Sequence, residues 1–271
     1  MLKTGLLAVF AGLSALLPAF AEGGLMKAEL KPATVAAFDA YMRTAEARLR
    51  YGGQGSFLWV DALPERRRLA LEGKALAAPW TAKGEIAVPD GLIHDWVGAV
   101  FIPDATLEKT ILLAENYDNN KNVYKPEVVD SKLLSRDGDD FKVFLRLLKK
   151  KVLTVTLNTT YDVRYTRVAV SRWRADAYSV RIAEVENAGE RNEREMPPGK
   201  DHGFMWRLNS FWRYEERDGG VFVECEAISL TREVPAGLGW LIDPIIRNLP
   251  KESLVNLLNN TRQALLGHPS R

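Results

Sequence analysis

A β-hairpin centred on Asp218-Gly219 is the feature that most constrains how this chain folds. Runs of alternating residues flank the dipeptide, a setting typical of a two-residue type I′ turn. The turn fixes the register of both strands, so Arg213 is expected directly opposite Glu224. One face then carries aromatic, apolar and small side chains, namely Trp206, Leu208, Ser210, Trp212 and Tyr214 beside Val221, Val223, Cys225, Ala227 and Ser229.

The stretch from Leu238 to Leu266 follows this hairpin and is rich in large apolar residues. Within it, Leu254, Leu258 and Leu265 recur at helical spacing, which predicts a helix lying with one face on the sheet. A sheet with aromatic side chains opposite small ones, covered by such a helix, encloses either a ligand pocket or an ordinary filled core. The hairpin alone does not decide between these two interpretations.

Composition excludes one class of partner and one kind of stabilisation. A net charge of +2 over 271 residues gives no electrostatic case for binding nucleic acid. Cys225 is the only cysteine, so the chain forms no internal disulfide and depends on burial for its stability. On the apolar face of the hairpin, this thiol is expected to be buried and inert.

The first 21 residues resemble a secretory signal peptide. Lys3 supplies the positive charge, 5–17 is an apolar run too short to span a bilayer, and Ala19-Phe20-Ala21 matches a cleavage site. We therefore expect a mature protein that starts near Glu22, is exported to the periplasm or secreted, and has no transmembrane segment. Residues 22–83 are predicted to form a helix, Pro32–Arg50, and extra strands appended to a main domain over 84–271.

The main domain is expected to contain one strand, two short helices, a run of antiparallel strands and the long C-terminal helix. This order resembles the START-like superfamily, which includes polyketide cyclases and lipid-transfer proteins, and in particular its exported bacterial members of undefined ligand. The resemblance covers roughly 84–266 and is carried by four stretches, namely 93–103, Tyr117-Asp118 with Tyr124-Lys125-Pro126, 203–210 and 249–254.

The resemblance implies an α+β helix-grip fold, in which a curved antiparallel sheet wraps around the C-terminal helix. It also implies a hydrophobic small molecule or lipid bound between the two, with no cofactor, no metal and no catalytic motif carried over. The side chains expected to line that site are Trp206, Leu208, Trp212, Tyr214, Val223, Cys225 and Ala227 on the hairpin, Arg181 on a neighbouring strand, and Trp240 and Ile245 on the helix.

Arg181 has two interpretations. Its alternation with Ala177, Ser179 and Ala183 points it into the cavity, where it would bind a carboxylate or phosphate headgroup. The preferred alternative is a structural pair with a carboxylate on an adjacent strand. The polar loop over 187–200 is one plausible entrance lid.

Acid–base candidates are few. Adjacent strand residues point to opposite faces, so His94 and Asp95 do not form a dyad. His202 is expected at the rim of the cavity, and Glu184 with Glu186 on one strand face. Two alternatives to a binding protein therefore stay open: an enzyme of cyclase or hydrolase type using Arg181, Tyr214 or His202, and an interaction protein with a filled core.

Overall fold

The computed structural model describes residues 26–50, 56–150, 154–233 and 239–267, with the backbone alone for 239–248. Its strands are β1 (Ala28–Glu29), β2 (Leu76–Pro79), β3 (Glu85–Val88), β4 (Gly91–Pro103), β5 (Val128–Asp137), β6 (Asp140–Lys150), β7 (Thr154–Ala169), β8 (Arg172–Glu186), β9 (Arg194–Glu195), β10 (Lys200–Asp201), β11 (Arg207–Arg217) and β12 (Gly220–Arg232). Its helices are α2 (Pro32–Arg50), η2 (Trp59–Ala62), α3 (Pro64–Leu71), α4 (Leu107–Glu115), η3 (Tyr117–Asn119), α5 (Asn120–Val123) and α6 (Gly239–Leu265).

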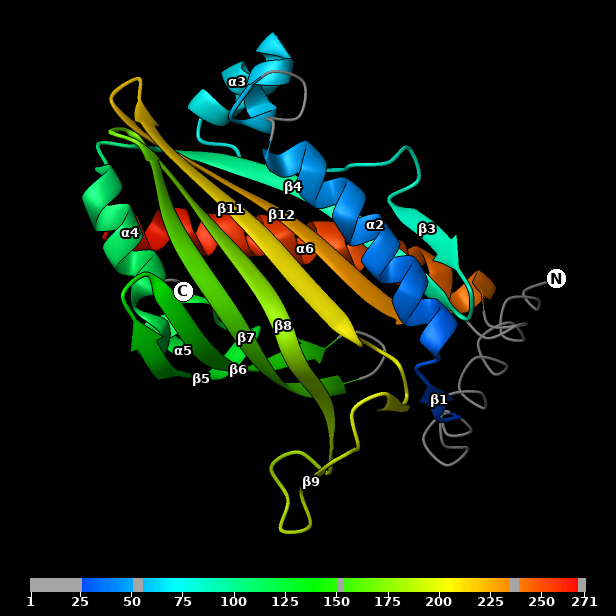
Figure 1. Ribbon diagram of the computed structural model, residues 1–271. Coiled ribbons are helices and arrows are strands. Elements are labelled where there is room, and N and C mark those ends of the chain that lie inside the picture. The colour runs from blue at the N-terminus through cyan, green and yellow to red at the C-terminus, as the bar shows by residue number, and fades with distance from the viewer. Residues whose placement is uncertain (1–25, 51–55, 151–153, 234–238, 268–271) are drawn as a thin grey trace, which may run out of the picture.

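A ten-stranded antiparallel sheet dominates the fold, with the order β2-β4-β12-β11-β8-β7-β6-β5 along its main path. The sheet curves around α6, which crosses behind the strands in Figure 1. We call the face under α6 the concave face and the opposite face the outer face. The predicted α+β helix-grip architecture is therefore confirmed.

The β11–β12 hairpin has the predicted turn and register. Asp218 and Gly219 have φ angles of 56° and 77°, the positive values that a type I′ turn requires. Arg217 pairs with Gly220, and Arg213 lies opposite Glu224. Because this register fixes the alternation of both strands, it decides which hairpin side chains reach the concave face.

The C-terminal helix packs closely on the concave face. Leu254 and Leu258 are buried, at the helical spacing predicted for this contact. Gly98 of β4 allows the close approach, because a Cβ at this position would lie 3.0 Å from the Cδ2 of Leu254. The core on this side of the sheet therefore depends on a small residue in β4 as well as on the leucines of α6.

Helix α2 covers the outer face, so the sheet has a helix on each side (Figure 1). The predicted span of α2 is confirmed, and Phe38 and Met42 bury their side chains in a cluster with Phe211 and Ile228 of the sheet. The segment before Gly84 also supplies β2, which pairs with β4. The segment thus packs against the domain through both a helix and a strand, and its separation at Gly84 stays a prediction.

The predicted signal peptide lies outside the described residues. Within the described part of the chain, no helix has both the length and the apolar character needed to span a membrane. Export stays a prediction from the sequence.

Candidate ligand site on the concave face

Six of the predicted ligand residues lie on the concave face. Tyr214, Val223 and Cys225 are buried in the core cluster under α6, and Leu208 and Trp212 pack against it while staying partly exposed. Ala227, opposite Ser210 in the hairpin register, is also half-buried. The rings of Trp212 and Tyr214 are stacked, with an interplanar angle of 5° and centroids 6.2 Å apart. The hairpin thus gives this face an aromatic wall next to small residues.

Trp206 does not belong to this wall. It precedes the first residue of β11, so the alternation of that strand does not determine its direction. Its ring is buried in the outer-face cluster with Phe38 of α2, and its indole N–H donates to Asp201 Oδ1 at 3.1 Å. The prediction that Trp206 lines the ligand site is wrong for this reason.

Arg181 points to the outer face instead of the cavity. The β7–β8 ladder contains a register shift, because Tyr161 pairs with Ser179 while Thr160 pairs with Arg181. This bulge at Val180 reverses the alternation of β8. Arg181 is consequently partly exposed and forms an ion pair with Glu195 of β9. The alternative of a structural pair with a neighbouring strand is confirmed.

The loop over 187–200 also lies on the outer side. Arg146 of β6 donates from both Nη atoms to Glu193, at 2.9 and 2.7 Å, and Asn158 of β7 donates to Glu195. These contacts hold the loop against outer-face residues, so it does not form the predicted lid over the concave site. The side chains of Trp240 and Ile245 lie outside the described residues, and their role stays a prediction.

Several hydroxyl groups on the concave side were not identified from the sequence. The phenols of Tyr117 and Tyr165 hydrogen-bond at 2.9 Å, and that of Tyr124 lies 3.3 Å from the hydroxyl of Thr261 on α6. Burial raises the pKa of Tyr117 and Tyr165 above the usual range, so both phenols stay protonated. Tyr161 also lies in this core, and alternation with Val163 and Tyr165 along β7 would have identified it. The site is therefore apolar with scattered uncharged donors and acceptors.

Burial also determines the chemistry of two predicted side chains. The pKa of Cys225 is raised well above its usual value by desolvation, so the thiol stays protonated and inert. His94 is buried, which lowers its pKa to about 4 and keeps it neutral. As predicted, His94 and Asp95 do not meet: His94 Nε2 contacts Thr231 Oγ1 at 3.1 Å, while Asp95 accepts from Tyr41 on α2.

One acid–base pair does form at the end of the sheet. His202 Nδ1 lies 2.8 Å from Glu184 Oε2, and the backbone N–H groups of His202 and Phe204 also donate to this carboxylate. Burial followed by the charge of Asp201 raises the pKa of Glu184. With both oxygens engaged by the turn, the carboxylate has a structural role in fixing the chain before β11.

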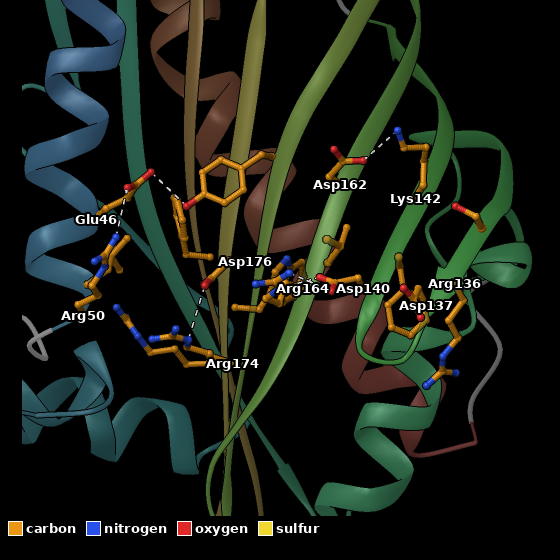
Figure 2. Close-up of a pocket in the computed structure, with 18 residues that line it drawn as sticks. Glu46, Arg50, Arg136, Asp137, Asp140, Lys142, Asp162, Arg164, Arg174 and Asp176 are labelled. Carbon is orange, nitrogen blue, oxygen red and sulfur yellow. Dashed lines mark hydrogen bonds and ion pairs between the residues drawn. The ribbon is translucent and has the colours of Figure 1, made fainter.

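A charged groove of about 810 Å³ lies on the outer face, between the C-terminal end of α2 and strands β5, β6, β7, β8 and β11. Figure 2 draws the side chains that line it and marks several ion pairs among them with dashed lines. Arg164 Nε lies 2.6 Å from Asp140, Lys142 Nζ 3.4 Å from Asp162, and Arg174 Nε 3.5 Å from Asp176. Because these charges compensate one another within the protein, the groove is a weaker ligand candidate than the concave face.

A second ionic network is buried under α2. Arg48 donates to both carboxylate oxygens of Glu226, at 2.5 and 2.9 Å, and lies 3.3 Å from Asp95. Glu224 accepts from Arg213 at 2.8 Å and from the backbone N–H of Trp59 at 2.7 Å. The sequence predicted the pairing of Arg213 with Glu224, but not that α2 and η2 would cover it together with Glu226.

Comparisons with known proteins find similarity of fold only. No protein-family model matches the sequence, and no curated relative matches it. Similar solved structures include TTHA0849 from Thermus thermophilus, at 16% identity and a TM-score of 0.46 over 63% of this chain and 96% of that one. A STAR-related lipid transfer protein from Xanthomonas axonopodis has 16% identity and a TM-score of 0.45, over 70% and 99% of the two chains. The Zhui aromatase/cyclase from Streptomyces sp. R1128 has 11% identity and a TM-score of 0.41, over 64% of this chain and 94% of that one.

Proposed function

We propose that this helix-grip protein binds a hydrophobic small molecule, a lipid being the foremost class, between the concave face and α6. The observation that carries the proposal is the incomplete burial of Leu208, Trp212 and Ala227 on the face that the helix covers. Apolar surface left accessible on this face favours an apolar ligand, by about 25 cal/mol for each Å² removed from water. Ligand pockets are typically apolar with a few polar groups, as on this face.

The proposal includes export. Its support is the sequence of the first 21 residues, in which Lys3, the apolar run over 5–17 and Ala19-Phe20-Ala21 follow the order of a secretory signal. A binding protein outside the cytoplasm would carry or store an apolar molecule across an aqueous compartment. No catalytic step is needed for that role.

The enzyme alternative has less support. It requires titratable groups that converge beside the ligand, and the pair that does converge, Glu184 and His202, is held by backbone N–H groups of the turn before β11. Arg181, named for the same alternative, is on the outer face. The filled-core alternative predicts that the purified protein carries no small molecule, and this is directly measurable.

Native mass spectrometry of the full chain expressed in bacteria and purified from the exported fraction tests the proposal. A discrete added mass that is removed by organic extraction and identified as a lipid or other apolar compound is the expected result. A mass equal to that of the polypeptide, under conditions that preserve a control lipid–protein complex, would contradict ligand holding and favour a filled core. Recovery of the protein only from the cytoplasmic fraction, with its first 21 residues intact, would contradict export.

A further inference from the structure

Tyr161 presents a buried hydroxyl group without a hydrogen-bond partner. The residue lies in β7 between Val143 of β6 and Ser179 of β8, and only 5% of it is exposed. It belongs to the core cluster that also contains Leu254 and Leu258 of α6. Its phenol oxygen is inaccessible to bulk water and makes no hydrogen bond within the described part of the protein.

Neighbouring hydroxyl groups do not satisfy Tyr161. Burial raises the pKa of Tyr161 and the nearby Thr159 hydroxyl lowers it, but that hydroxyl donates to the carbonyl oxygen of Leu145 at 2.7 Å and does not meet hydrogen-bond geometry with the phenol. Tyr117 and Tyr165, by contrast, satisfy each other. Because buried polar groups are nearly always hydrogen-bonded, an unpaired phenol among apolar side chains indicates a partner that is not part of the chain.

The described surroundings of Tyr161 offer no counter-ion to a charged ligand group. Val143 and Ser179, the cross-strand neighbours of Tyr161, are uncharged, and Arg136 with Glu115 of α4, Lys149 with Glu127, and Glu184 with His202 form pairs of their own. On α6, Arg262 has a buried Nε without a partner among the described residues, but its guanidinium lies against Gly73, just before the edge strand β2 and far along the sheet from β7. A ligand charge beside Tyr161 would therefore be buried without a counter-ion, which is strongly unfavourable.

We propose that the concave site takes an uncharged amphipathic ligand, with a hydrocarbon body and an ester, ketone or alcohol oxygen that accepts a hydrogen bond from Tyr161. This inference rests on the proposed function and deepens it, because it names the ligand's polar group and the residue that holds it. The hydrocarbon body lies along Leu208, Trp212 and Ala227, and the phenol of Tyr161 fixes the depth at which the oxygen enters.

Competition for a neutral fluorescent probe tests this assignment. The delipidated full-length protein is loaded with N-phenyl-1-naphthylamine, which is then displaced by methyl dodecanoate, dodecane or dodecanoate. These three compounds share the same chain length and differ in the polar group. Methyl dodecanoate should displace the probe at the lowest concentration, about fivefold below dodecane, which is the effect of one added hydrogen bond. Dodecanoate should be the weakest competitor because its carboxylate finds no counter-ion.

The Tyr161→Phe variant assigns the preference to the phenol. It should raise the half-displacement concentration of methyl dodecanoate about fivefold and leave that of dodecane unchanged. Its melting temperature should not fall, because the deleted hydroxyl has no partner within the described part of the protein. Tyr165→Phe should lower the melting temperature, because it leaves the Tyr117 hydroxyl unpaired. Tyr178→Phe, on the outer face, removes a hydrogen bond to Glu46 and should leave all displacement curves unchanged.

The outcomes separate the inference from the function on which it rests. Probe binding with no preference between methyl dodecanoate and dodecane, or a preference that survives in Tyr161→Phe, would overturn the inference and leave the proposed function intact. Preference for dodecanoate would overturn the uncharged class. Failure of the wild-type protein to bind the probe or any of the three compounds would contradict the proposed function and the inference together.

Discussion

Arg213 and Glu224 face each other across the β11–β12 hairpin, with Arg213 Nη1 2.8 Å from Glu224 Oε1 and the two side chains 12% and 0% exposed. The turn at Asp218-Gly219 sets this pairing, and α2 and η2 close over the outer face where it lies. Glu226, two residues further along β12, is held in the same way by Arg48 of α2. The hairpin therefore organises both faces: it gives the concave side an apolar wall and the outer side a sealed ionic network.

Arg48 holds α2 on the sheet. Replacing it by Ala leaves Asp95 and Glu226 buried with one cation fewer, so Arg48→Ala should lower the free energy of unfolding by about 3 to 5 kcal/mol. Arg50→Ala is the matched control on the same helix, because Arg50 is 69% exposed and 3.9 Å from Glu46. Its effect should be within about 0.5 kcal/mol. Urea denaturation measures both, and equal losses in the two variants would contradict a specific role for Arg48.

Asp95 should make stability decrease with rising pH. Burial, and then the neighbouring charge of Glu226, raises the pKa of Asp95 to about 7, against an unfolded value near 4. The folded state thus holds the extra proton between these values, so the stabilising contribution is complete below pH 4 and is lost as the pH rises through 7. Burial also raises the pKa of Glu224 to about 7, with the same sign.

The Asp95→Asn variant isolates this contribution. Between pH 5 and pH 8 the wild type should lose about 2 kcal/mol more stability than the variant, measured by urea denaturation at both values. His94, whose pKa is lowered to about 4, contributes with the opposite sign below pH 6.5, but it is present in both proteins and cancels in the difference. The same pH dependence in the two proteins would show that Asp95 is already ionised at pH 5.

The sequence predicts the scaffold better than the site because local rules determine the scaffold. Asp218-Gly219 sets the hairpin register, and the apolar spacing of α2 sets its span, since both signals lie within a few residues of what they specify. Arg181 and Trp206 were misplaced because their directions depend on features that alternation does not reveal: a bulge at Val180 and a strand that begins at Arg207. Tyr161 was missed because an unpaired hydroxyl is visible only when its three-dimensional neighbours are known.

Arg181 should be dispensable for ligand binding. Its side chain is 42% exposed on the outer face and pairs with Glu195, so Arg181→Ala should leave N-phenyl-1-naphthylamine affinity unchanged. Loss of this partly screened ion pair should lower the free energy of unfolding by less than about 1 kcal/mol. A tenfold weaker affinity for the probe in a folded variant would show that Arg181 contributes to the ligand site after all.

Ala227 should limit the space available to a ligand. It is half-buried on the concave face opposite Ser210, so Ala227→Phe places a ring in the accessible apolar space and should reduce affinity for the probe at least tenfold. Ala87→Phe introduces the same ring at an exposed position in β3 and serves as the matched control. Unchanged affinity in a folded Ala227→Phe protein would place the ligand elsewhere.

Gly98 should set how closely α6 approaches the sheet. A Cβ at this position would lie 2.7 Å from the carbonyl oxygen of Leu76 and 3.0 Å from Leu254 Cδ2, both closer than normal contacts. Gly98→Ala should therefore lower the free energy of unfolding by about 1 to 3 kcal/mol through overpacking. Leu254→Ala removes part of that clash while costing core burial of its own, so the double variant should be less destabilised than the sum of the two single variants. Additive losses in this double-mutant cycle would show that Gly98 does not control the position of the helix through Leu254, and that the Leu76 backbone alone accounts for the cost.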